Sequence, residues 1–112
     1  MPQSEFLGEF EQVVLLTVAR LEGWAYGMAI RQEIEERTSQ DVAIGSVYSA
    51  LDRMEKKGLV ASEVGDPTPE RGGRAKRYYR LRRQGVLALT RSHETYAKLW
   101  EGLELDQEAY GR

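Results

Sequence analysis

The sequence contains no cysteine and a single histidine, and these absences exclude several classes of protein. Without cysteine there is neither a disulfide framework nor a cysteine metal site. The longest apolar run, Val13 to Leu16, is far too short to cross a bilayer. The opening residues, MPQSEFLGEFEQ, lack a basic start followed by an apolar stretch, so we expect no secretory signal. The expected location is the cytoplasm.

The net charge of −2 conceals a strong segregation of charge along the 112 residues. Residues 1–51 hold three Lys or Arg against eight Asp or Glu (−5), residues 52–83 hold ten against five (+5), and residues 84–112 hold three against five (−2). Exposed charges are screened beyond roughly 10 Å at moderate salt, so a local basic patch matters more than the total. The basic middle segment is therefore compatible with an anionic binding partner, although the whole chain is acidic.

Two helices are predicted from the spacing of apolar residues in the first third of the chain. Steps of three and four are typical of one apolar stripe on a helix. The first helix should end near Leu21, before Gly23, and the second should fade near Thr38 and Ser39. The two stripes are Phe6, Phe10, Val13, Val14, Thr17 and Leu21, and then Tyr26, Ala29, Ile30 and Ile34.

A third helix is predicted from about Gly45 to Lys57, stopped by Gly58. At 100° per residue its two faces differ sharply in chemistry. One face is apolar and should pack on the core, while the other is polar and contains no acid. The apolar face holds Val47, Ala50, Leu51 and Met54, and the polar face holds Ser46, Ser49, Arg53 and Lys56, with Tyr48, Asp52 and Glu55 on a flank between them.

A β-hairpin and a long helix are predicted in the rest of the chain. LVASEV and KRYYRL have the character of short strands, and GDPTPERGGRA supplies the prolines and glycines of a loop. One of Tyr78 and Tyr79 should pack on the core. From Arg83 a heptad seam predicts a helix of about 25 residues, roughly 37 Å long. The seam residues are Val86, Leu89, His93, Tyr96, Trp100 and Leu103.

These elements together predict a fold that is mainly α with a small β-hairpin, a winged helix-turn-helix. We expect a DNA-binding domain at residues 1–82 and a C-terminal dimerisation helix at 83–112. The third helix would read bases in the major groove, and a flexible cationic hairpin would contact the DNA backbone. The wing residues for this role are Arg71, Gly72, Gly73, Arg74, Lys76 and Arg77. The alternative for these cations is a solvated, mobile hairpin.

The sequence also resembles a known family. AYGMAIRQEIEERT, IGSVYSALDRMEKKGLV and PERGGRAKRYYRL are similar to the PadR family of bacterial transcription factors, over roughly Leu7 to Leu89. The resemblance implies a dimeric repressor on palindromic operator DNA, belonging to the smaller subfamily with one dimerisation helix. It implies a phosphate contact for Tyr48, and a wing signature at Gly72, Gly73, Arg74, Lys76 and Arg77. RRQG departs from the threonine-containing turn of many relatives.

Two seam residues have competing interpretations. His93 is interpreted as a polar group that fixes the register of a dimer, because no second ligand is spaced to form a metal site with it. Trp100 is interpreted as an interface anchor, but with Tyr96 it is also a candidate site for a small planar aromatic effector, as the family resemblance implies.

No nucleophile with its base, no phosphate-binding glycine loop and no cofactor motif stands out, so we expect neither an enzyme nor a cofactor. The alternative function is a winged-helix interaction module that binds an acidic protein and no specific DNA.

Overall fold

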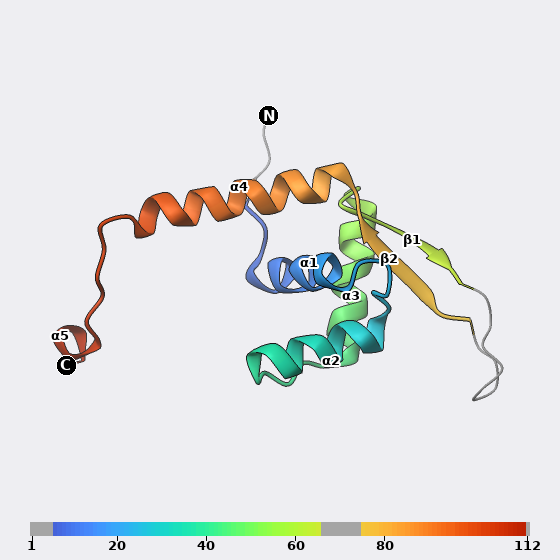
Figure 1. Ribbon diagram of the computed structural model, residues 1–112, viewed down its shortest axis with the longest axis horizontal. Coiled ribbons are helices and arrows are strands. Elements are labelled where there is room, and N and C mark those ends of the chain that lie inside the picture. Colours follow the sequence, from blue (N-terminus) through green and yellow to red (C-terminus); the bar gives the residue numbers. More distant parts are fainter. Residues whose placement is uncertain (1–5, 66–74, 112) are drawn as a thin grey trace.

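The computed structural model describes residues 6–65 and 75–111 and confirms the predicted fold class. Three helices are followed by a two-stranded hairpin and a long helix, in the order of a winged helix-turn-helix (Figure 1). The elements are α1 (Glu9–Leu21), α2 (Gly27–Thr38), α3 (Ile44–Lys56), β1 (Val60–Val64), β2 (Arg77–Leu81), α4 (Arg83–Trp100) and the short α5 (Gln107–Tyr110). No helix in these described ranges is long and apolar enough to span a membrane.

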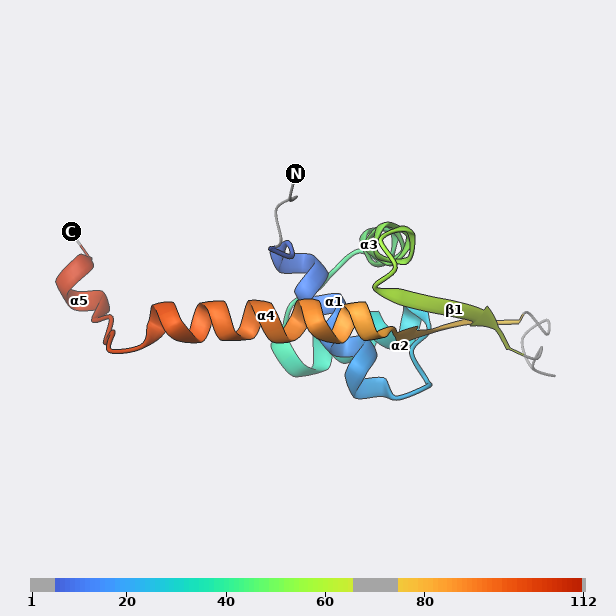
Figure 2. The same ribbon diagram turned by 90° about the horizontal axis from the view of Figure 1, so that it is seen from above.

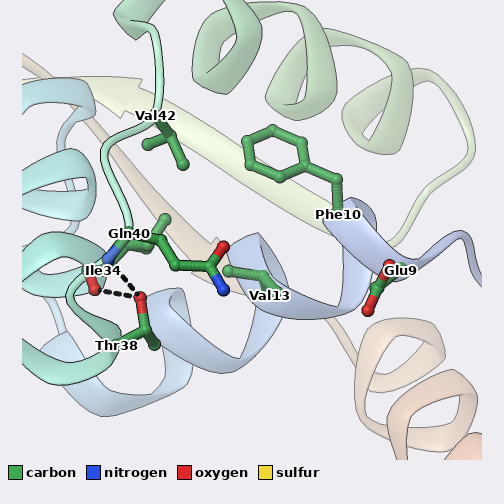
Figure 3. A pocket seen from close by; sticks show the side chains of 7 residues that line it. All are labelled: Glu9, Phe10, Val13, Ile34, Thr38, Gln40 and Val42. Carbon is green, nitrogen blue, oxygen red and sulfur yellow. Dashed lines mark hydrogen bonds between the residues drawn. The ribbon is translucent and has the colours of Figure 1, made fainter. Parts of the chain in front are cut away.

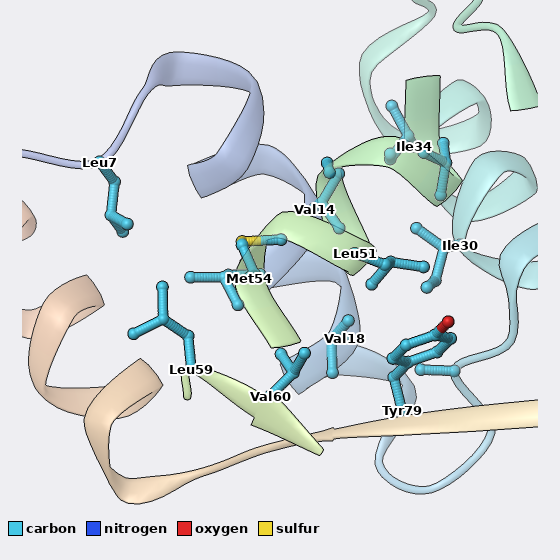
Figure 4. Close-up of a cluster of buried hydrophobic side chains, with 14 residues drawn as sticks. Leu7, Val14, Val18, Ile30, Ile34, Leu51, Met54, Leu59, Val60 and Tyr79 are labelled. Carbon is cyan, nitrogen blue, oxygen red and sulfur yellow. The ribbon is translucent and has the colours of Figure 1, made fainter. Parts of the chain in front are cut away.

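The hydrophobic core lies between α1, α2, α3 and the hairpin (Figure 4). The apolar stripe in the sequence predicted the position of α1 correctly, but it predicted only some of the residues that this helix buries. Leu15 and Val18 are buried although the stripe omits them, and Phe6, which it includes, is exposed. The reason is that α1 packs on α2, α3, α4 and β2 at once, so its buried arc is wider than one stripe.

The two strands pair antiparallel, with Val60 opposite Leu81 and Val64 opposite Arg77. Tyr79 is buried and Tyr78 is not, which confirms that one of the two tyrosines packs on the core. The segment between α1 and α2 adds a bridge to this sheet, because the N–H of Tyr79 donates to the carbonyl of Ala25 at 2.8 Å. The hairpin is therefore fixed both to α3 and to the turn that precedes α2.

The start of α4 is packed tightly against Leu59, which directly precedes β1, and against the hairpin. The N–H of Arg82 donates to the carbonyl of Leu59 at 2.9 Å. A β-carbon added at Gly85 would lie 2.3 Å from the same carbonyl oxygen, closer than real side chains approach. Only glycine fits at this junction, so RRQG supplies a residue that the packing of α4 requires.

The expected length of the last helix is wrong. α4 has 18 residues and ends at Trp100, because Glu101 has an extended backbone and Gly102 takes a left-handed φ of +81°. Leu103 therefore lies beyond the helix. Both views show α4 leaving the winged domain and carrying α5 to the far end of the molecule (Figures 1 and 2). The principal extents are 57 × 37 × 21 Å, so the chain is elongated.

Candidate nucleic-acid interface

The two faces of α3 are arranged as the sequence predicts. Val47, Ala50, Leu51 and Met54 have no exposed surface, because α3 packs on α1, α2 and β1. The opposite side of the helix is exposed to solvent and carries hydroxyl and cationic groups. Its residues are Ser46, Ser49, Arg53 and Lys56, and Tyr48 on the flank is exposed beside them. A helix with this exposed face has the size and chemistry to contact base edges in a major groove.

This exposed surface is not free of acids, which corrects the description of the polar face drawn from the sequence. Lys56 Nζ lies 3.3 Å from Asp52 Oδ2, one turn earlier on the same helix. Arg53 Nε lies 3.6 Å from Oε2 of Glu11, which α1 supplies. The helical wheel missed both contacts because long side chains reach across a flank, and because Glu11 comes from another helix.

Glu11 is a site residue that the sequence reasoning missed. Its side chain is 9% exposed and accepts a hydrogen bond from Lys57 Nζ at 3.1 Å and from the N–H of Gly8 at 3.2 Å. Burial raises the pKa of this carboxyl, but the Gly8 hydrogen bond, Lys57 and Arg53 outweigh burial, so the net pKa lies below its ordinary value of 4.5. The available signal in the sequence was a glutamate in the first turn of α1, directly after Phe10 of the apolar stripe.

Tyr48 lies against the N-terminus of α2. A β-carbon at Gly27 would be 2.4 Å from Tyr48 Cε1 and Cζ, so the phenol ring occupies the space of a side chain there. Tyr48 itself is half exposed. The first N–H groups of a helix lack intrahelical acceptors and attract anions. Gly27, the first residue of α2, thus leaves room for the Tyr48 hydroxyl beside a helix N-terminus, an arrangement suited to a phosphate oxygen.

The strands of the hairpin connect to α3 through two hydrogen bonds. Arg77 Nη1 donates to Ser62 Oγ at 3.0 Å, and Ser62 Oγ donates to Glu55 Oε2 at 2.8 Å. Arg77 is exposed and lies on the α3 side of the sheet. The structure thus connects this wing cation, through Ser62, to Glu55 on the flank of the third helix.

Lys76 points elsewhere. Its Nζ lies 5.2 Å from the centre of the Tyr26 ring, in a cation–π contact. Tyr78 makes edge contacts with Tyr26 and Trp24, at ring-centre distances of 5.6 and 6.3 Å. Sequence reasoning missed this aromatic cluster, which the alternation of Trp24, Ala25 and Tyr26 could have indicated. The remaining predicted wing residues, Arg71, Gly72, Gly73 and Arg74, lie outside the described residues.

The seam residues of the C-terminal region are largely uncovered by the rest of the chain. Leu89 is half-buried on α1, whereas His93 is exposed and Val86, Tyr96, Trp100 and Leu103 are each 46% exposed or more. Among the described residues, no three His, Cys, Asp or Glu side chains are placed to hold a metal ion.

A hollow of about 300 Å³ opens between α1 and α4. Of the two candidate effector residues, Tyr96 lines it and Trp100 does not. Its lining residues are Gln12, Leu16, Leu89, Thr90, His93 and Tyr96.

A second hollow of about 300 Å³ lies between the start of α1, the end of α2 and the turn before α3 (Figure 3). Apolar Phe10, Val13 and Val42 form much of its wall, and Glu9 and Gln40 stand among them. The Thr38 hydroxyl donates to the carbonyl of Ile34 at 2.7 Å, so its hydrogen-bond donor is already used within α2. None of its lining residues belongs to the exposed face of α3.

Comparison with known proteins agrees with this arrangement. The model of the transcriptional regulator PadR-like family matches residues 15–91. A protein of Lysinibacillus sphaericus named only as uncharacterized is 31% identical over 111 residues, which cover 96% of this chain and 97% of that protein. A PadR-like transcription factor from Bacteroides fragilis is 26% identical, with a TM-score of 0.72, over 82% of this chain and 84% of that one. A PadR family regulator from Eggerthella lenta is 26% identical, with a TM-score of 0.66, over 84% and 81%.

The family match covers more than half of the chain, including α2, α3 and both strands. This protein therefore belongs to the PadR-like family of transcriptional regulators.

Proposed function

We propose that the protein is a homodimeric repressor that binds palindromic operator DNA in the cytoplasm. The observation that carries the proposal is the exposed polar face of α3, with Ser49 and Arg53 outward, beside Tyr48 at the N-terminus of α2. Base edges are read by hydrogen-bonding side chains in the major groove, while helix N-termini and cations contact phosphates. Family membership supports a regulatory role over an enzymatic one.

Dimerisation is proposed from the uncovered apolar side chains of the C-terminal region. Val86, Tyr96, Leu99, Trp100 and Leu103 are all exposed in the single chain. Monomeric proteins rarely leave contiguous apolar patches of this kind uncovered, and a twofold dimer would cover the same surface on both copies. Two recognition helices related in this way require an inverted repeat, with half-site centres roughly 34 Å apart.

A small aromatic effector is proposed for the hollow between α1 and α4, where Tyr96 and His93 offer aromatic faces and Leu16 and Leu89 offer apolar contact. A molecule bound there would touch both the winged domain and the dimerisation helix. Trp100 does not line this hollow in the single chain. No cofactor is proposed.

The deciding experiment measures binding to an inverted-repeat duplex from the promoter upstream of the protein's own gene, with excess scrambled competitor. We expect stoichiometric binding of one dimer per repeat. Replacing Arg74 and Lys76 by alanine should weaken binding to operator and to scrambled DNA equally. The slope of log affinity against log salt concentration should become shallower by about 0.9 per lost phosphate contact.

Arg53→Ala, in contrast, should weaken operator binding and leave scrambled DNA less affected, since a bidentate arginine contact discriminates bases by about 1–3 kcal/mol. Equal affinity of the wild type for operator and scrambled DNA would favour the interaction module that binds an acidic protein. In that case the exposed cations of α3 serve a protein partner.

A further inference from the structure

Glu11 is a buried carboxylate that contacts the cations at the C-terminal end of α3. One oxygen, Oε1, accepts the N–H of Gly8 at 3.2 Å, which fixes the carboxylate on its own helix. The other oxygen, Oε2, faces Lys57 Nζ at 3.1 Å and Arg53 Nε at 3.6 Å. Because both oxygens are occupied and the side chain is 9% exposed, Glu11 has little freedom to turn away.

A second acid near the same surface has a different character. Asp52 pairs with Lys56 on the outside of α3, and their side chains are 65% and 78% exposed. Exposed pairs of this kind contribute little and exchange readily with water and salt. Asp52 and Glu11 are thus two acids near one helix, of which only Glu11 is itself buried and held by hydrogen bonds.

The geometry of the contact leaves the far end of Arg53 available. Nε is the guanidinium nitrogen nearest Glu11, and the two Nη atoms lie beyond it on a side chain that is 53% exposed. The guanidinium is planar and carries five N–H donors, four of them on the Nη atoms. A paired set of these donors matches O6 and N7 of guanine in the major groove.

We propose that Glu11 is a positioning residue for base recognition: it holds Arg53 by Nε so that the Nη atoms meet a guanine. The same carboxylate discourages Arg53 from binding a phosphate, because Glu11 repels the DNA backbone. Glu11 therefore lowers affinity for all DNA and raises discrimination between sequences. This inference rests on the proposed function and assigns the discriminating contact to a pair of residues from α1 and α3.

The test uses a duplex selected by the full-length wild-type protein from a random-sequence library, and a scrambled copy of it. Glu11→Asp keeps the charge but shortens the side chain by one methylene, which withdraws the carboxylate from Arg53. We expect the operator-to-scrambled affinity ratio to fall about tenfold, with scrambled affinity unchanged. Glu11→Gln keeps the length but removes the charge, so the ratio should fall while scrambled affinity rises.

Two controls separate positioning from folding. Glu33→Asp also shortens by one methylene an acid that pairs with an arginine, Arg37, but this pair lies on α2, and the affinity ratio should stay unchanged. In an Arg53→Ala background, Glu11→Asp should have no further effect on the ratio, because the residue through which it acts is gone. Thermal unfolding of each variant reports the stability change separately.

The outcomes distinguish this inference from the function on which it rests. If the wild type selects no motif, the proposed function fails and the inference fails with it. If the wild type is selective but Glu11→Asp lowers only the melting temperature and leaves the ratio intact, Glu11 merely holds α1 to α3. A tenfold loss of the ratio that disappears without Arg53 supports the inference.

Discussion

The winged domain and the C-terminal region of this chain differ in how much of their apolar surface one copy can bury. From α1 to β2, the chain encloses a core in which Leu15, Ile30, Leu51 and Met54 are fully buried. In α4, only Gly85 and Ser92 are buried, and Trp100 is 58% exposed. The winged domain therefore buries its core within one chain, whereas the C-terminal region leaves apolar side chains exposed, which the proposed dimer would cover.

The overall dimensions reflect the same difference. A compact domain of this length has a radius of gyration of about 13 Å, whereas this chain has 16.8 Å. The excess comes from α4 and α5, which extend past the winged domain (Figure 2). A single copy thus packs α3 firmly in the winged domain but leaves the apolar side chains of α4 exposed.

The largest expected effect is on assembly. Trp100→Glu places a carboxylate in the exposed apolar seam, so the dimer should weaken by roughly 2 kcal/mol or more, about 30-fold, and the protein should sediment as a monomer or fail to fold. Val64→Glu is the matched control, because Val64 is an equally exposed apolar residue of the winged domain. If the wild-type chain sediments as a stable monomer at micromolar concentration, the C-terminal region does not need a second copy, and the proposed dimer is wrong.

A smaller effect is expected at the junction of the two regions. Gly85→Ala forces a methyl group against the carbonyl of Leu59, so the free energy of unfolding should fall by roughly 1–3 kcal/mol. Gly45→Ala is the matched control in α3, where nothing lies within 4 Å of the added carbon. That change should stabilise by up to about 1 kcal/mol. Urea denaturation measures both, and equal values would mean that the junction tolerates a side chain.

The smallest effect concerns pH and is confined to the winged domain. The folded-state pKa of Glu11 lies below its ordinary value of 4.5, so its contribution to stability is complete above that pH and is lost as pH falls through the folded pKa. The stability difference between wild type and Glu11→Gln should therefore shrink on acidification below about 4.5. Urea denaturation at several pH values checks this, and a difference that grows in acid would contradict it.

Periodicity in the sequence predicted the elements whose local pattern and tertiary role agree. In α3, Val47, Ala50, Leu51 and Met54 follow helical spacing and face one core, so the wheel gave the correct burial. In α1 the same reasoning did not predict that Leu15 and Val18 are buried, because a helix that packs on several neighbours buries more than a single stripe. The seam of α4 continued in sequence to Leu103, but Gly102 ended the helix earlier.

The site was predicted less completely than the fold. The exposed residues of α3 could be named from a wheel, whereas the Glu11 contact joins residues 42 positions apart and depends on how α1 crosses α3. Likewise, Lys76 and Arg77 are neighbours in sequence but point to Tyr26 and to Ser62 respectively. Charge counting identifies a basic segment, but only packing decides where each cation goes.

The tight contact at Gly85 has a consequence for the distance between two DNA half-sites. With a hydrogen bond and backbone contact fixing the start of α4 to Leu59, the angle between the winged domain and α4 has little freedom. In a dimer joined through α4, the separation of the two α3 helices is then set by protein geometry. An added base pair lengthens DNA by about 3.4 Å and rotates it by roughly a tenth of a turn. A rigid dimer cannot follow such a change, so operators of this regulator should share one fixed spacing.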